Sequence, residues 1–219
     1  MEKGATLKQA EKILSLFNET PVEQMQDVIE SGFLADIRDA NIADVNRDKL
    51  RQFLGLKLLK PSLLRFIGEV NIPATTEKFV ARDKFVVNTD KNAPVKISYL
   101  RDDFQKWFLG KVEEPTVEAT LRYAELAKSS VDRPILAELG NTVETTLAGT
   151  YALMERQPNR EYGTLLTNGC ADIFYVRDVN GELRAVDVGW FGGGWGVLAY
   201  SVEDPDAWRD GSRVFSRNS

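Results

Sequence analysis

Residues 189–196 read GWFGGGWG, three consecutive glycines framed by two tryptophans and a phenylalanine. A dinucleotide-binding loop needs the spacing G-x-G-x-x-G between a strand and a helix, but Gly192 and Gly194 are followed by Val197 where the third glycine belongs. A Walker loop needs a lysine after its last glycine, and none follows. Because the next residues alternate as in a strand, no helix N-terminus is available to hold an anion. We therefore predict a glycine-rich hairpin loop, with a ligand-contacting loop as the alternative.

This hairpin belongs to a predicted antiparallel meander at the C-terminal end of the chain. Asn180 and Gly181 are flanked by alternating residues, which is the strongest short hairpin signal, and we expect both to adopt positive φ. The predicted strands lie in CADIFYVRD (170–178), ELRAVDVGWF (182–191), WGVLAYSVED (195–204) and RVFSR (213–217).

Residues 1–62 have the pattern of a small helical bundle. Thr20, Pro21 and Glu23 match a capping box, in which the threonine oxygen accepts from the glutamate amide and proline takes the first helical position. The apolar residues expected inside the bundle recur at helical spacing: Ala10, Ile13, Leu14, Phe17, Val22, Met25, Ile29, Phe33, Leu34, Ile37, Leu50, Phe53 and Leu54.

Residues 63–115 form a predicted β-rich region. In its third strand the alternation places Val95, Ile97 and Tyr99 on one face. We also expect a short helix over residues 102–108 that is capped by Asp102, and a boundary at residues 113–115, Glu-Glu-Pro. The predicted strands lie in LRFIGEV (64–70), EKFVARDKFVV (77–87) and VKISYL (95–100).

Residues 116–219 are expected to form an α+β region that ends in the meander. An N-cap pattern at residues 141–144 starts a helix, and its inner face carries Val143, Leu147, Tyr151 and Met154. The fold class predicted for the whole chain is therefore α+β, with an N-terminal helical bundle, a central β-rich region, and a C-terminal helix plus antiparallel β-meander.

Composition restricts the chemistry further. The chain has no histidine and one cysteine, Cys170, which excludes imidazole bases, imidazole or multi-thiolate metal sites, and intramolecular disulfides. We expect no cofactor, no metal site and no catalytic residue.

The net charge of −5 is spread along the chain without a basic stripe, which argues against nucleic-acid binding. Since no signal-peptide core or membrane-length apolar run is found, we expect a cytoplasmic protein without a membrane partner.

The aromatic C-terminal sheet is the candidate binding surface. Aromatic side chains and arginine anchor many interfaces, and both are concentrated in the predicted strands and turns. We predict a non-catalytic binding protein whose partner is a protein or a small ligand. Its predicted binding residues are Tyr175, Arg184, Trp190, Trp195, Tyr200 and Trp208.

Two other functions stay open. A hydrolase, with or without a divalent cation, would use paired carboxylates, and acidic residues lie on or beside neighbouring predicted strands. Single-stranded nucleic-acid binding would use the aromatics and arginines, but residues 170–219 carry eight acidic residues against five arginines, and this net charge of −3 repels phosphates. Cys170 is interpreted as a buried small hydrophobe rather than a nucleophile. The candidate carboxylates are Asp172, Asp187, Glu203 and Asp204.

Several segments together resemble a known set of proteins. They are QMQDVIESGFLADIRDANIADV (24–45), KFVVNTDKNAPVKISYL (84–100), NGCADIFYVRDVNGELRAV (168–186) and VFSRN (214–218). These segments are similar to parts of uncharacterised modular proteins predicted from the genomes of candidate-phylum bacteria, where they occur in shuffled combinations. The resemblance implies no particular activity, cofactor or catalytic residue, but shuffled modules fit recognition or assembly better than one conserved reaction.

Overall fold

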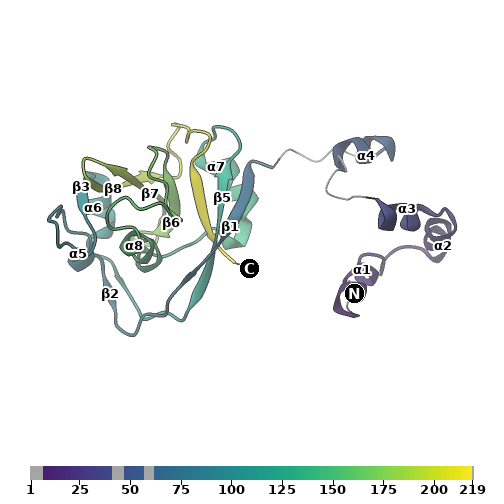
Figure 1. Ribbon diagram of the computed structural model, residues 1–219, viewed down its shortest axis with the longest axis horizontal. Helices are drawn as coiled ribbons and strands as arrows, with labels where there is room; N and C mark the ends of the chain where they lie inside the picture. Colours follow the sequence, from purple (N-terminus) through teal and green to yellow (C-terminus); the bar gives the residue numbers. More distant parts are fainter. Residues whose placement is uncertain (1–6, 41–46, 57–61, 219) are drawn as a thin grey trace. The chain divides into compact units, whose positions relative to one another are not determined.

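The computed structural model describes residues 7–40, 47–56 and 62–218. The chain divides into two compact units, Met1–Lys60 and Pro61–Ser219. The first unit is helical, and the second combines helices with a large mixed sheet, so the α+β class is confirmed. Figure 1 shows the elements of each unit.

The first unit contains four short helices among its described residues. Neither α2 nor α3 has a buried residue, and Val22 and Phe53 are 85% and 86% exposed. The apolar core expected for a bundle is therefore not confirmed in the described part of this unit. The helices are α1 (Leu7–Ser15), α2 (Val22–Glu30), α3 (Phe33–Asp39) and α4 (Arg47–Phe53).

The capping box expected at the start of α2 is wrong. Pro21 itself is the N-cap residue, with φ −56° and ψ 143°, and no side-chain hydrogen bond caps the helix. Because proline has no side-chain oxygen and Thr20 lies one residue too early, the threonine hydroxyl does not satisfy the first amides.

A seven-stranded sheet organises the second unit, with the order β1-β5-β9-β6-β7-β8-β3. Neighbouring strands are antiparallel except for the β6–β9 and β3–β8 pairs, which are parallel. A separate two-stranded sheet joins β2 (Phe79–Val80) to β4 (Val112–Glu113). The large sheet consists of β1 (Leu64–Ile72), β3 (Ile97–Leu100), β5 (Ala119–Leu126), β6 (Asp172–Arg177), β7 (Leu183–Phe191), β8 (Gly194–Ser201) and β9 (Arg213–Arg217).

The C-terminal strands form a meander only in part. Strands β6, β7 and β8 follow one another as antiparallel neighbours, but β9 returns to lie between β5 and β6. The sheet also joins residues 63–115 to residues 116–219, since β1 pairs with β5 and β3 with β8. No boundary near residue 115 divides this unit, and the Glu113 carboxylate accepts hydrogen bonds from the amides of Leu147 and Ala148 at 3.0 and 2.9 Å.

Two strand predictions in the central region need correction. Residues 77–87 form only the short β2, after which Ala81–Lys84 make a helical turn, α5. Tyr99 does not share a face with buried Val95 and Ile97, because the β3–β8 register shifts between Ile97 and Tyr99, and Tyr99 is 46% exposed. Local alternation could not reveal this irregularity, which belongs to the pairing of two distant strands.

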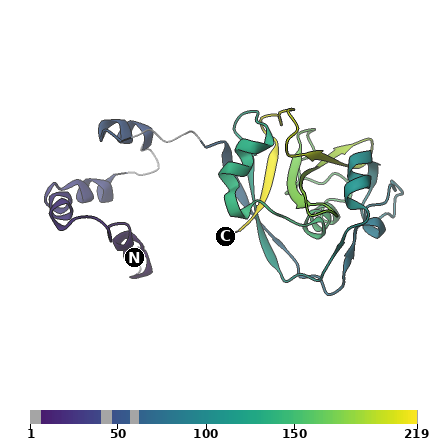
Figure 2. The same cartoon turned by 180° about the vertical axis from the view of Figure 1, so that it is seen from behind.

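Helices cover both faces of the large sheet, as the two opposite views in Figures 1 and 2 show. Helices α6 (Asp102–Phe108) and α8 (Leu147–Glu155) contribute to the larger hydrophobic core, which includes Trp195 and Phe174. Helix α7 (Asp132–Leu139) contributes Ile135 to a smaller core on the other face, which includes Ile173 and Tyr175. Trp208, in the loop between β8 and β9, also packs against this smaller core.

Two predicted helix starts are wrong. Arg101, rather than Asp102, is the N-cap of α6, and it makes no capping side-chain bond. Residues 140–142 form a single 3₁₀ turn, and α8 begins only at Leu147, where the Thr146 hydroxyl accepts from the Gly149 amide at 3.0 Å. The buried helix face is confirmed for Leu147, Tyr151 and Met154.

The glycine stretch is a hairpin turn, as predicted. Gly192 and Gly193 have φ of 64° and 85°, and the strands on either side pair Trp190 with Trp195. The indole rings of these tryptophans meet edge to face at 5.2 Å. The other turn differs from expectation: among the described non-glycine residues only Arg160 has positive φ, so Asn180 does not.

Replacing Gly193 by alanine should destabilise the protein by about 1 kcal/mol, because a side chain at positive φ is strained even though nothing lies within 4 Å of the added Cβ. Gly193→Asn should cost less, since asparagine tolerates this conformation. Urea unfolding of both variants measures the difference. Equal losses would contradict a turn limited by backbone conformation.

Candidate functional site

Two adjoining pockets lie where the β8–β9 loop crosses the smaller-core face of the sheet. We name them the Asp187 pocket, of about 260 Å³, and the Asp132 pocket, of about 160 Å³. Ala207 and Trp208 line both, so we call the two together the Trp208 groove. The Asp187 pocket is lined in part by Cys170, Asp187, Phe191 and Arg209, and the Asp132 pocket by Asp132, Tyr200, Asp204 and Asp206.

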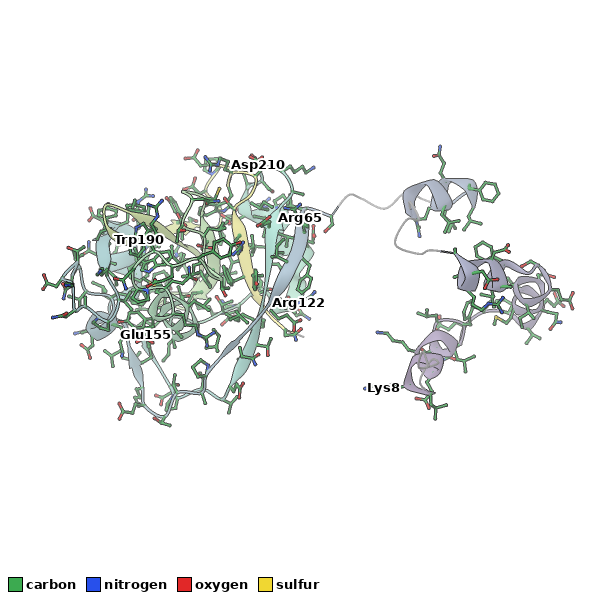
Figure 3. The ribbon with its side chains drawn as sticks, viewed as in Figure 1. Lys8, Arg65, Arg122, Glu155, Trp190 and Asp210 are labelled. Atoms are coloured by element: carbon green, nitrogen blue, oxygen red, sulfur yellow. The ribbon has the colours of Figure 1, made fainter. Side chains whose placement is uncertain are left out.

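Strand alternation positions the floor of the groove. Asp187 pairs with Ile173, so both face the smaller core, and Gly189 follows two residues later on the same face. Gly189 pairs with Gly196, and a Cβ added at Gly196 would fall inside the Phe191 ring. The absence of side chains at these glycines lets the Phe191 ring lie close over the sheet. Figure 3 shows Trp190 on this sheet and Asp210 on the β8–β9 loop.

Asp132 is the buried anchor of the smaller pocket. It is 1% exposed, and its Oδ1 accepts hydrogen bonds from the Tyr175 hydroxyl at 2.6 Å and the Trp208 indole N–H at 2.8 Å. Burial raises the pKa of this carboxyl, while the two hydrogen bonds act in the opposite direction. The arrangement fixes the Trp208 ring in the groove.

Asp187 is the acid of the larger pocket, and its side chain is half-buried. Its Oδ1 is buried and accepts no hydrogen bond from any described residue. Burial raises the pKa of this carboxyl to about 7, against a weaker lowering effect of the Asp172 amide. A carboxyl that lines a cavity with one buried oxygen and a shifted pKa is typical of a functional site.

Tyr200 and Trp208 form the aromatic wall of the Asp132 pocket. Their ring centroids lie 5.3 Å apart at an interplanar angle of 90°. The Arg101 guanidinium lies over the Tyr200 ring, 4.5 Å from its centroid. Burial and the charge of Asp187 raise the Tyr200 pKa, which makes Asp187 an electrostatic neighbour of this wall.

Cys170 lies at the rim of the Asp187 pocket and is not fully buried, contrary to its interpretation as a core residue. The Arg209 guanidinium donates to its Sγ at 2.9 Å. Cys170 therefore belongs to the polar edge of the groove.

The structure brings together three of the six predicted binding residues. Tyr200 and Trp208 line the Asp132 pocket, and Trp190 joins the lining of the Asp187 pocket. Two of the others, Tyr175 and Trp195, are completely buried. These two aromatic rings fill the cores and do not form part of the surface.

Arg184 is also held within the fold. Its guanidinium pairs with the buried Asp178 at 3.0 Å and lies 4.2 Å from the centroid of the Trp107 ring. The Asp178 carboxylate in turn accepts from the amides of Asn180 and Glu182, so this arginine helps to hold the β6–β7 turn.

The four candidate carboxylates do not converge on one place. Asp172 pairs with Val188 and faces the larger core, whereas Asp187 faces the smaller one, so the sheet separates them. Asp172 is completely buried and accepts from the Leu166 amide at 2.6 Å. Glu203 is exposed and pairs with Arg133 at 2.7 Å. Of the four candidates, Asp187 and Asp204 line the groove, each in a different pocket.

The groove residues that sequence reasoning missed are Asp132, Asp206, Phe191 and Arg209. Asp132 meets Tyr175 and Trp208 across 43 and 76 residues of chain, and no local pattern indicates such contacts. The Asp-Pro-Asp sequence at residues 204–206, in a loop beside aromatic strands, was the one available sign of an acidic patch.

Two cavities elsewhere in the second unit have volumes of about 290 and 310 Å³. In the first, the Lys84 ammonium lies 5.5 Å from the centroid of the Tyr151 ring. In the second, the Glu138 carboxylate accepts from the amides of Leu63 and Leu64. These charged groups have partners within the fold, in contrast to Asp187 Oδ1.

Residues 7–40, 47–56 and 62–218 include no group of three or more carboxylates or thiols arranged to hold a metal ion. In the same ranges, no helix combines the length and apolar character needed to cross a bilayer.

Comparison with protein-family models, with curated proteins and with solved structures gives no match. The fold and the groove therefore define the protein only as an α+β protein with a mixed seven-stranded sheet and an acidic, aromatic groove.

Proposed function

We propose that the protein is a cytoplasmic, non-catalytic binding protein and that the Trp208 groove receives its partner, a protein segment or a small ligand. One observation carries this proposal: two pockets share the Trp208 side chain, and one of them contains a buried carboxylate oxygen without a donor. A bound hydrogen-bond donor would remove the cost of that unpaired oxygen.

Binding is favoured over hydrolysis by the placement of the acids. A paired-carboxylate hydrolase of the glycosidase type holds two carboxyls on either side of one bond, and Asp172 and Asp187 lie on opposite faces of the sheet. Asp187 and Asp204 line different pockets of the groove. Nucleic-acid binding is disfavoured because Asp132, Asp204 and Asp206 line the groove and would repel phosphates. The resemblance to shuffled modular proteins agrees with a recognition role.

A fragment screen by NMR on the ¹⁵N-labelled full chain tests this function. We expect fragments to shift the indole N–H signal of Trp208, because its N–H donates to Asp132 at the groove. The Trp195 indole should stay unchanged, since it is buried and donates to the Gln157 carbonyl.

A blocking variant supplies the control for this screen. Ala207→Arg places a long side chain in the groove from an exposed position that lines both pockets, and it should abolish the Trp208 shifts. Ala137→Arg adds the same charge on an exposed position of α7 and should preserve them. Fragments that bind only beside Tyr151, or none at all, would contradict the proposal.

A further inference from the structure

The charge of the groove selects among ligands. Asp132, Asp204 and Asp206 all line the Asp132 pocket, and no basic group within the described residues forms an ion pair with any of them. Arg101 lies over the Tyr200 ring of this pocket, but its ion-pair partner is Asp103 at 3.6 Å. Arg133 pairs with Glu203 at 2.7 Å. The pocket therefore has three acidic side chains without an ion-pair partner among the described residues, and Arg101 is the neighbouring cation.

Asp132 is prepared to receive a donor. Both hydrogen bonds that it accepts end on Oδ1, and no described residue donates to Oδ2. Because the side chain is 1% exposed, its orientation is set by Tyr175 and Trp208 rather than by water. A carboxylate fixed in this way loses little freedom when it binds a cation.

The walls of the pocket favour an organic cation over a bare ion. The Trp208 ring lines the pocket, and the Arg101 guanidinium already lies over the neighbouring Tyr200 ring, 4.5 Å from its centroid. The faces of aromatic rings attract ammonium and guanidinium groups. The volume of about 160 Å³ suits a group of side-chain size, since a cavity of roughly 150 Å³ holds benzene.

The adjoining Asp187 pocket, which shares the Trp208 side chain, gives a second and independent indication of a ligand with N–H donors. Asp187 Oδ1 is buried without a donor in the adjoining pocket. Arg209 is the cation at that rim, and it donates to Cys170. A ligand that brings N–H donors to both sides of Trp208 would satisfy acceptors that the fold leaves open.

We infer that the Trp208 groove binds an organic cation, a primary ammonium or guanidinium group, with Asp132, Asp204 and Asp206 as its counter-charges and Trp208 as its aromatic wall. The inference rests on the proposed binding function and gives it a ligand class. The cation can belong to a free amine or to a basic side chain of a peptide.

Titration of the full chain, followed by the Trp208 indole signal, tests the inference. The probes are butylammonium as a free amine, the blocked peptide acetyl-Gly-Arg-Gly-amide, and its neutral citrulline counterpart. The arginine peptide should bind about tenfold more tightly than the citrulline peptide, because citrulline keeps the shape but loses the charge. Comparing butylammonium with the arginine peptide distinguishes a free amine from a peptide side chain.

Two surface variants keep the test independent of folding. Asp204→Asn and Asp206→Asn remove charge from the pocket without disturbing the Asp132 hydrogen bonds, and each should weaken the cation by about threefold or more. Equal affinity of the arginine and citrulline peptides, or no effect of either variant, would overturn the cation inference while fragment binding still supports the groove. A fragment screen without any Trp208 shift would instead remove the proposed function.

Discussion

Asp187→Asn should stabilise the protein above neutral pH and remove part of its pH dependence. Burial raises the Asp187 pKa to about 7 from an ordinary value of 3.8, so ionising this side chain costs more in the folded protein than in the unfolded chain. The stability that the protonated form contributes is complete below about pH 4 and is lost as the pH rises to about 7. Asparagine carries no charge and does not incur this loss.

The size of the effect follows from the shift of about three pH units, which corresponds to at most about 4 kcal/mol at pH 8. The Asp187 side chain keeps partial exposure, so the measured gain should fall below this limit. Urea unfolding of variant and wild type between about pH 4 and pH 8 gives the difference directly. We expect this difference to grow with pH and to level off above pH 7.

Asp210→Asn is the matched control, because Asp210 is an exposed aspartate on the β8–β9 loop, which also carries Trp208. It should leave the stability difference flat across the same pH range. A flat profile for Asp187→Asn as well would show that this carboxyl ionises normally. A gain in stability that accompanies a loss of ligand binding is the pattern of a residue kept for function.

Trp195→Ala should destabilise the protein by about 3–5 kcal/mol. Its side chain is completely buried in the larger core, and its indole N–H donates to the Gln157 carbonyl at 3.2 Å. The truncation leaves a large cavity and removes the donor of the Gln157 carbonyl. The Gln157 side chain in turn makes two hydrogen bonds with the backbone of Leu165, so the loop between these residues should also lose support. Thermal and urea unfolding measure the loss.

Two further variants separate the effect of lost ring packing from the effect of where each tryptophan lies in the hairpin. Trp195→Phe keeps most of the ring volume and should cost less than the alanine variant. Trp190→Ala, on the paired strand, should cost about 1–2 kcal/mol because Trp190 is only half-buried. Similar losses for Trp190→Ala and Trp195→Ala would contradict the inner position of Trp195.

The sequence alone determined the features that depend on neighbours in the chain. Consecutive glycines at 192 and 193 allow the positive φ of a tight turn, so the β7–β8 hairpin was predictable. Short runs rich in β-branched and aromatic residues between turn residues indicated β1, β6, β7, β8 and β9, and helical spacing identified the buried face of α8. Composition, through the lack of histidine, restricted the possible chemistry before any fold was known.

Tertiary structure alone decided which aromatics reach the surface and where the acids meet. Trp190 and Trp195 are cross-strand partners that both pack against the larger core, yet Trp195 is completely buried whereas Trp190 is only half-buried and lines a pocket. Asp132 becomes part of the groove only because α7 packs on the face that carries Tyr175, far along the chain. Side-chain burial depends on what covers each face of a sheet, and that is set by contacts between distant segments, which no local pattern records.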